Sequence, residues 1–98
     1  MSDVIFQPKS GEVALGTSTG AAIDVNGAEY VRLINTAALG THYLITLEQT
    51  DGSEIGTFSI DGGTSVVIRK ASNHKIWSAN AAGLACRVRV NSKAGLVG

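Results

Sequence analysis

The sequence contains one cysteine, Cys86, so no internal disulfide can form. This excludes the disulfide-stapled framework of many small secreted domains. No apolar run approaches the roughly 20 residues that a membrane-spanning helix needs. The first residues, MSDVIFQPKSG, also lack the basic start and long apolar core of a secretory signal. These absences favour a protein that is made in the cytoplasm and has no membrane partner.

The residues that usually carry out catalysis or bind metals are sparse and scattered. His42, His74 and Cys86 are isolated in the sequence, without the spacing of a metal site. No GxSxG motif is present, and Cys86 lies in a strand-like run where a small buried side chain is expected. We therefore expect no catalytic residue, no metal and no cofactor, and we interpret the chain as a non-enzyme.

Acidic residues are missing from the last part of the chain. All eight Asp and Glu fall in residues 1–61, against only Lys9 and Arg32, whereas residues 62–98 contain six Lys and Arg. One interpretation is a basic surface that binds nucleic acid. The interpretation that we favour is that late strands pair beside early ones, so that opposite charges meet across strands. Nucleic acid is therefore not the expected partner.

Short strand-like runs and turn signals fill the chain. Residues 42–70 contain three such runs, separated by Asp51-Gly52 and Asp61-Gly62-Gly63, which predict consecutive antiparallel strands. Turn signals recur roughly every 8–12 residues, a spacing typical of sandwiches and barrels. The sequence predicts an all-β fold, a small antiparallel β-sandwich or barrel of about 7–9 short strands.

Three segments are expected along the chain. Residues 1–11, which contain the only proline, Pro8, are predicted to be an N-terminal arm or edge strand. Residues 12–91 are predicted to form the β-sandwich domain, and residues 92–98 a flexible C-terminal tail.

Alternation of apolar and polar residues predicts which side chains are buried. A bulge near Gly56 would place Ile55 on the same face as Phe58 and Ile60. In the run from Ala85 to Val90, Cys86 is predicted to face inward and Arg87 and Arg89 the other way. The side chains expected to supply most of the core are Tyr43, Ile45, Leu47, Phe58, Ile60, Val66, Ile68, Val88 and Val90.

The run from Tyr30 to Val90 resembles small virion proteins of tailed bacteriophages. The segments that carry this resemblance are YVRLINT (30–36), LITLEQTDGSEIGTFSIDGG (44–63) and TSVVIRKASNHKIWSA (64–79). The resemblance implies a capsid decoration (cement) protein that binds and stabilises the head lattice. It implies the major capsid protein or another virion protein as partner, in lattice-bound or homo-oligomeric copies, and localisation in the virion.

Candidate partner-binding residues come from three places. Val4, Ile5 and Phe6 form an apolar trio that is unfavourable if exposed on a monomer, although it could equally be the first strand of the sandwich. Trp77 could stack on a sugar or a base, and Arg87 and Arg89 project from one strand face. These last three residues support the alternative function, a small ligand-binding β-module for carbohydrate or nucleic acid.

Overall fold

The alternating runs fold into strands along most of the chain. The computed structural model describes residues 6–92 and 95–97. The elements in chain order are β1 (Phe6–Pro8), β2 (Val13–Ala14), the short 3-10 helix η1 (Thr19–Ala21), β3 (Tyr30–Asn35), β4 (Tyr43–Glu48), β5 (Glu54–Ile60), β6 (Ser65–Arg69), β7 (Lys75–Ser78), β8 (Gly83–Ser92) and β9 (Gly95–Val97).

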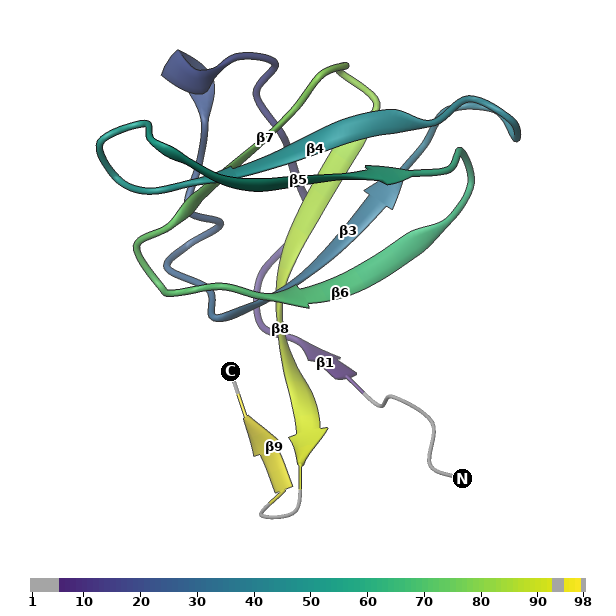
Figure 1. Ribbon diagram of the computed structural model, residues 1–98. Helices are drawn as coiled ribbons and strands as arrows, with labels where there is room; N and C mark the ends of the chain where they lie inside the picture. Colours follow the sequence, from purple (N-terminus) through teal and green to yellow (C-terminus); the bar gives the residue numbers. More distant parts are fainter. Residues whose placement is uncertain (1–5, 93–94, 98) are drawn as a thin grey trace.

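These strands form two antiparallel sheets that lie in two layers (Figure 1). The large sheet has six strands, in the order β1-β8-β3-β6, with β2 and β9 also paired to β8. The small sheet has three strands, in the order β5-β4-β7. We call the side of the large sheet that packs on the small sheet its inner face, and the opposite side its outer face. The predicted all-β, sandwich-like class is confirmed.

The second Asp-Gly turn does not make the hairpin that the sequence suggested. β4 and β5 pair as expected, but β6 leaves this sheet and pairs with β3 in the large sheet. Gly63 has a φ of 74° in the turn, and a side chain on Gly62 would collide with the carbonyl oxygen of Ala38. The turn therefore packs against the loop after β3 and carries the chain from one layer to the other.

The first Asp-Gly turn and the bulge lie where the sequence placed them. Gly52 has a φ of 90°, and its N–H donates to Gln49 O at 3.0 Å. The β4–β5 register shifts between Leu47 and Glu48, opposite Gly56 and Glu54, so the extra residue is Ile55. This residue is 44% exposed, so the expectation that the bulge brings Ile55 onto the buried face is wrong.

The main core lies between the two sheets. Its buried residues are Leu15, Val25, Ala28, Val31, Leu33, Ile45, Ile60, Ile76 and Ala85, with Val13, Ile23, Leu47, Phe58 and Ile68 packed against them. The prediction is thus confirmed for the expected residues of β4 and β5 except Tyr43, which is half-buried and lies outside the core clusters. Val66 was assigned wrongly: it is 37% exposed, because the edge strand β6 is incompletely covered.

The side chains on the two faces of β8 pack into two different buried clusters. Ala85 lies opposite Leu33 and reaches the main core from the inner face. Cys86, Val88 and Val90 lie on the outer face, where they form a second buried cluster with Tyr30 and Val67 packed against it. Cys86 is therefore buried, as expected, but it points away from the small sheet.

A buried carboxamide joins the loop after β3 to the end of β5. Asn35 Nδ2 donates to Thr41 O at 3.0 Å and to Ile60 O at 2.7 Å, and Ala37 N donates to Asn35 Oδ1 at 2.9 Å. Asn35 is only 2% exposed, and these three bonds satisfy its side chain. This contact fixes the loop against which the Gly62 turn packs.

Both ends of the described chain pair with the far half of β8, which extends beyond the sandwich (Figure 1). Phe6–Pro8 form an edge strand opposite Val88 to Val90. Gly95–Val97, inside the expected C-terminal tail, pair with β8 as β9. Val4 and Ile5 lie outside the described residues.

Candidate functional site

The outer face of the large sheet carries two arginines, each next to an aromatic ring. The strand register places Arg32 of β3 opposite Val67 of β6, and Tyr30 opposite Arg69. The Arg32 guanidinium lies 5.7 Å from the centre of the Phe6 ring, and that of Arg69 lies 5.9 Å from the centre of the Tyr30 ring. Such contacts hold a cation against a ring and contribute about 0.5–1 kcal/mol at an exposed site.

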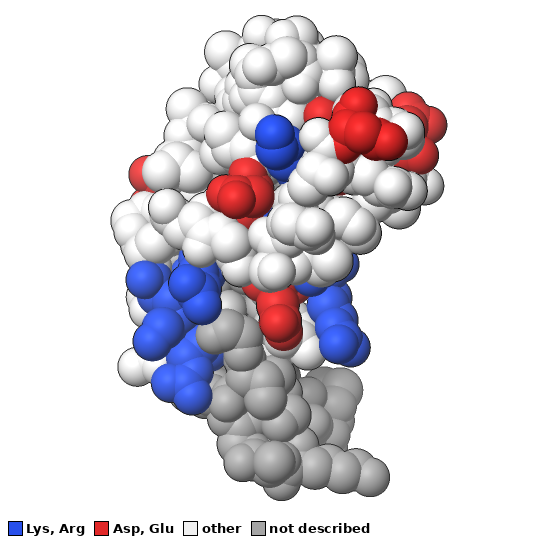
Figure 2. Space-filling model, turned by 90° about the vertical axis from the view of Figure 1, so that its left-hand side faces the viewer, with Lys and Arg blue, Asp and Glu red and all other residues white. Residues whose placement is uncertain are grey.

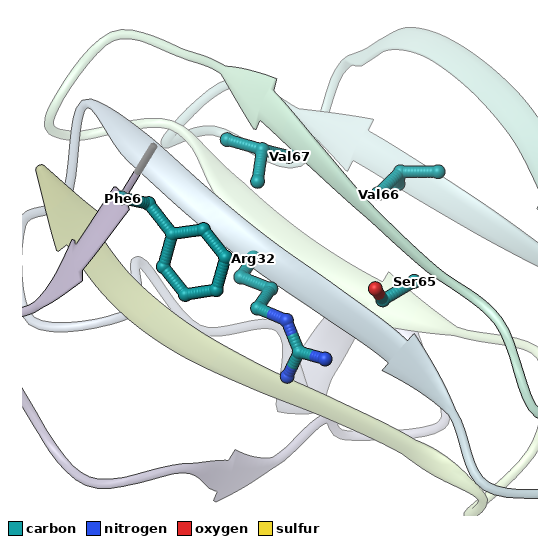
Figure 3. A pocket seen from close by; sticks show the side chains of 5 residues that line it. All are labelled: Phe6, Arg32, Ser65, Val66 and Val67. Carbon is teal, nitrogen blue, oxygen red and sulfur yellow. The ribbon is translucent and has the colours of Figure 1, made fainter. Parts of the chain in front are cut away.

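A shallow pocket lies next to the first of these pairs, on the outer face of the large sheet between the Phe6 ring and β6. It has a volume of about 270 Å³ and is lined by Phe6, Arg32, Ser65, Val66 and Val67. Figure 3 shows the Phe6 ring beside the Arg32 side chain, with the other three residues on the neighbouring strand. We call this the edge pocket. Its walls combine exposed apolar surface with one guanidinium, a composition suited to binding a peptide or protein surface.

Arg32 is held in place by a second partner. Its Nη1 lies 3.6 Å from Glu12 Oε2, and the side chains of Arg32 and Glu12 are 28% and 46% exposed. The ion pair and the ring contact together orient the guanidinium toward the pocket. The ion pair itself is partly in water, so its contribution to folding stability is small.

A second hollow, of about 410 Å³, lies at the end of β6, but the lysine that lines it already makes hydrogen bonds within the domain. It is lined by Glu29, Arg69, Lys70 and Ala71. The Lys70 side chain is buried, and its Nζ donates to the carbonyl oxygens of Ala71 and Ser72, both at 3.2 Å. Burial lowers the pKa of Lys70, and the charge of Asp24 opposes that shift. Lys70 therefore ties down the turn before β7.

Trp77 lies in the small sheet, and its side chain also makes a hydrogen bond within the domain. Its Nε1 donates to Glu48 Oε2 at 3.2 Å, and Thr19 Oγ1 donates to the same oxygen at 2.8 Å. Glu48 is only 2% exposed, so these bonds compensate a buried carboxylate. The Glu48 carboxylate thus ties Thr19 of η1 to the small sheet, and the half-buried indole of Trp77 shares this acceptor.

The candidate residues do not form one surface. Phe6 lines the edge pocket, Trp77 belongs to the small sheet, and Arg87 lies opposite Val31 on the inner face. Arg87 Nη1 donates to Asn26 O at 3.4 Å, and Arg89 pairs across from Gln7. Sequence reasoning did not propose Arg32 or Tyr30 as binding residues. The alternation of Tyr30, Arg32 and Ile34 on one face of β3 is the signal that could have indicated them.

The unequal charge distribution persists in three dimensions. On the face that Figure 2 shows, most Lys and Arg lie toward one end and most Asp and Glu toward the other, with single exceptions at each end. The strand register sets Lys75 of β7 opposite Glu48 of β4, but the Glu48 carboxylate accepts its hydrogen bonds from Thr19 and Trp77. The interpretation that opposite charges of late and early strands meet therefore stays a prediction.

Other sources of function give no positive signal. Within the described residues, no helix has the length and apolar character that crossing a membrane requires. No group of three or more His, Cys, Asp or Glu in residues 6–92 and 95–97 is arranged to hold a metal ion. Comparisons with protein-family models, with curated proteins and with solved structures found no match to this chain.

Proposed function

We propose that this chain is a non-enzymatic structural protein of a tailed-bacteriophage virion. It acts as a decoration (cement) protein that binds the major capsid protein and stabilises the head lattice. The observation that carries the proposal is the edge pocket, a partly apolar hollow beside the last strand of the large sheet among the described residues. The resemblance of Tyr30 to Val90 to small virion proteins supplies the identity of the partner.

A decoration protein needs a rigid surface that binds in many copies rather than a site that reacts. The edge pocket fits this requirement because its residues come from paired strands of the large sheet. Each copy need bury only a modest area, since a standard interface takes ~800 Å² per partner. Repetition over the lattice then adds strength without a new type of contact.

The proposal is tested by adding the purified chain to heads that lack it. The heads come from the phage that encodes the chain. Wild-type protein should bind to saturation and raise the temperature at which the heads break open. Ser65→Glu, which places a charge in the edge pocket, should weaken binding. Ser59→Glu is the matched control, because Ser59 is exposed on the small sheet and Ser65 is exposed on β6. No binding by the wild-type protein, or equal loss in both variants, contradicts the proposal.

Single-stranded nucleic acid is the second candidate ligand, and the two arginine–aromatic pairs favour it. Bases stack on exposed rings, while guanidinium groups follow the backbone. This function predicts oligonucleotide binding that weakens steeply with salt and is lost in Arg69→Ala. Oligonucleotide binding by a chain that does not bind heads would replace the decoration proposal with this one.

A further inference from the structure

Three basic side chains lie together on the inner face of the large sheet, where β8 begins to extend beyond the sandwich. Lys9 N donates to Arg87 O at 2.7 Å, which continues the register that sets Gln7 opposite Arg89. Residues directly opposite on paired strands share a face, as do alternate residues of one strand. Lys9, Arg87 and Arg89 are therefore neighbours on one face, and we call these three residues the basic cluster.

Two members of the basic cluster, Lys9 and Arg87, have no acidic partner in the described part of the chain. Neither forms an ion pair with a carboxylate of residues 6–92 or 95–97. Arg87 Nη1 donates to Asn26 O at 3.4 Å, while the buried Nε of Arg87 has no hydrogen-bond partner among these residues. Adjacent cations repel one another, so an anionic group that binds beside them stabilises this face.

The chain carries a matching acidic surface at the turn between β4 and β5. Asp51 and Glu54 are exposed there, next to Ile55, which is 44% exposed. Ser53 N donates to Asp51 Oδ1 at 2.9 Å, and this bond lowers the pKa of Asp51, so the carboxylate is oriented and charged at neutral pH. We call Asp51, Glu54 and Ile55 the acidic tip.

The acidic tip and the basic cluster of one molecule lie apart. Figure 1 shows the β4–β5 turn in the layer of the small sheet, away from the part of β8 that extends beyond the sandwich. The turn closes a hairpin of two paired strands, so the tip is held at this distance from its own cluster. On the face that Figure 2 shows, most basic and most acidic residues likewise lie toward opposite ends. A tip that reaches a cluster must therefore come from another copy.

We propose that the acidic tip of one copy binds the basic cluster of the next. The guanidinium of Arg87 and the ammonium of Lys9 suit carboxylate partners, and the formal net charge of the chain is zero, so copies join without accumulating charge. The arginine–aromatic pairs that favour nucleic acid lie on the other face of the sheet. Because tip and cluster are different surfaces, the contact is heterologous and builds a ring or an open chain.

A charge-swap experiment on the full-length protein tests this contact. Light scattering over a concentration series in about 0.02 M salt, where the Debye length is on the order of 20 Å, should give a mass above that of the monomer. Raising the salt to about 0.5 M should weaken the association. Lys9→Glu and Glu54→Lys should each weaken it by roughly tenfold, and the double variant should recover part of this loss.

Asp61→Lys is the matched control, because it makes the same change of charge as Glu54→Lys at the other end of β5. The side chain of Asp61 is 72% exposed, and its contact with His42 is long, at 4.0 Å, so the variant should fold and associate like the wild type. Circular dichroism should show that all four variants keep the fold of the wild type.

Three results would overturn the inference. One is a wild type that stays a monomer in low salt, and another is association that Lys9→Glu and Glu54→Lys leave unchanged. The third is oligonucleotide binding that Lys9→Glu abolishes while association persists, which would assign the basic cluster to nucleic acid. The proposed function is tested separately, because Ser65→Glu alters the edge pocket and leaves the tip and the cluster intact.

Discussion

Replacing Asn35 by Asp should be among the most damaging isosteric changes in this protein. The substitution exchanges an amide that donates to two buried carbonyls, at 3.0 and 2.7 Å, for a carboxylate oxygen that repels them. Each buried polar group left without its partner costs about 1–3 kcal/mol, so the loss should be roughly 2–6 kcal/mol. A domain of this size has a total stability of only about 5–15 kcal/mol.

The assay is urea denaturation at pH 7, followed by circular dichroism. Asn73→Asp is the matched control, because Asn73 is exposed in the turn before β7 and the chemical change is the same. In Asn35→Asp, burial beside two carbonyls should raise the pKa of the introduced carboxyl in the folded state. Its charge-related deficit should therefore be largest above that raised pKa and shrink as the pH falls toward ~3.9, the ordinary value for an aspartic acid.

A specific result would refute this reasoning. If Asn35→Asp is no less stable at pH 7 than Asn73→Asp, the carboxamide does not join the loop to β5. A deficit in Asn35→Asp that stays constant between pH 7 and pH 3 would mean that the loss comes from packing, not from the buried charge.

Three further substitutions probe the core and the buried polar groups. Ile45→Ala should lower the free energy of unfolding by roughly 2–5 kcal/mol, whereas Val66→Ala should cost less than about 1 kcal/mol, both measured in urea; equal losses would mean that the edge of β6 is covered. Cys86→Ala should fold and bind heads normally with a modest loss of stability, and loss of binding would reveal a role for the thiol beyond packing. For Lys70, whose pKa is lowered by burial, the unfolded chain binds more protons between the folded pKa and 10.5. Wild-type stability relative to Lys70→Met should therefore increase as the pH rises through that window, and a decrease would contradict the burial of this amine.

Alternation within a strand was enough to predict most of the buried faces in β4 and β5. Ile45 and Ile60 are buried where a period of two places them, because the small sheet covers the core on one side only. Ile55 shows the limit of this rule, since a bulge inserts a residue whose side chain need not follow either face. Local pattern thus predicts strands well and irregular pairing poorly.

The pairing of strands across the two layers could not be predicted from local pattern. Asp61-Gly62-Gly63 has the composition of a hairpin turn, yet contact with Ala38 and the Asn35 bonds direct β6 to the large sheet. That choice depends on residues far apart in the sequence. It also leaves β6 as an edge strand, which is why Val66 is exposed.

The candidate site depends on the same long-range pairing. The contact of Phe6 with a partner stays a prediction, and in the structure Phe6 lines the edge pocket. Arg32 and Val67 join it only because β3 pairs with β6 and the Phe6 ring reaches Arg32 from β1. Trp77, by contrast, looked available in the sequence, but a buried carboxylate on the neighbouring strand accepts its N–H.

The central claim is most directly tested by a cryo-electron microscopy reconstruction of the virion that contains this chain. The account predicts density for the domain at regular positions on the head, with the edge pocket and the outer face of the large sheet turned toward the capsid protein. Trp77 and the small sheet should face away from the shell. Heads without such density, or a domain bound through the small sheet with the edge pocket open to solvent, would contradict the account.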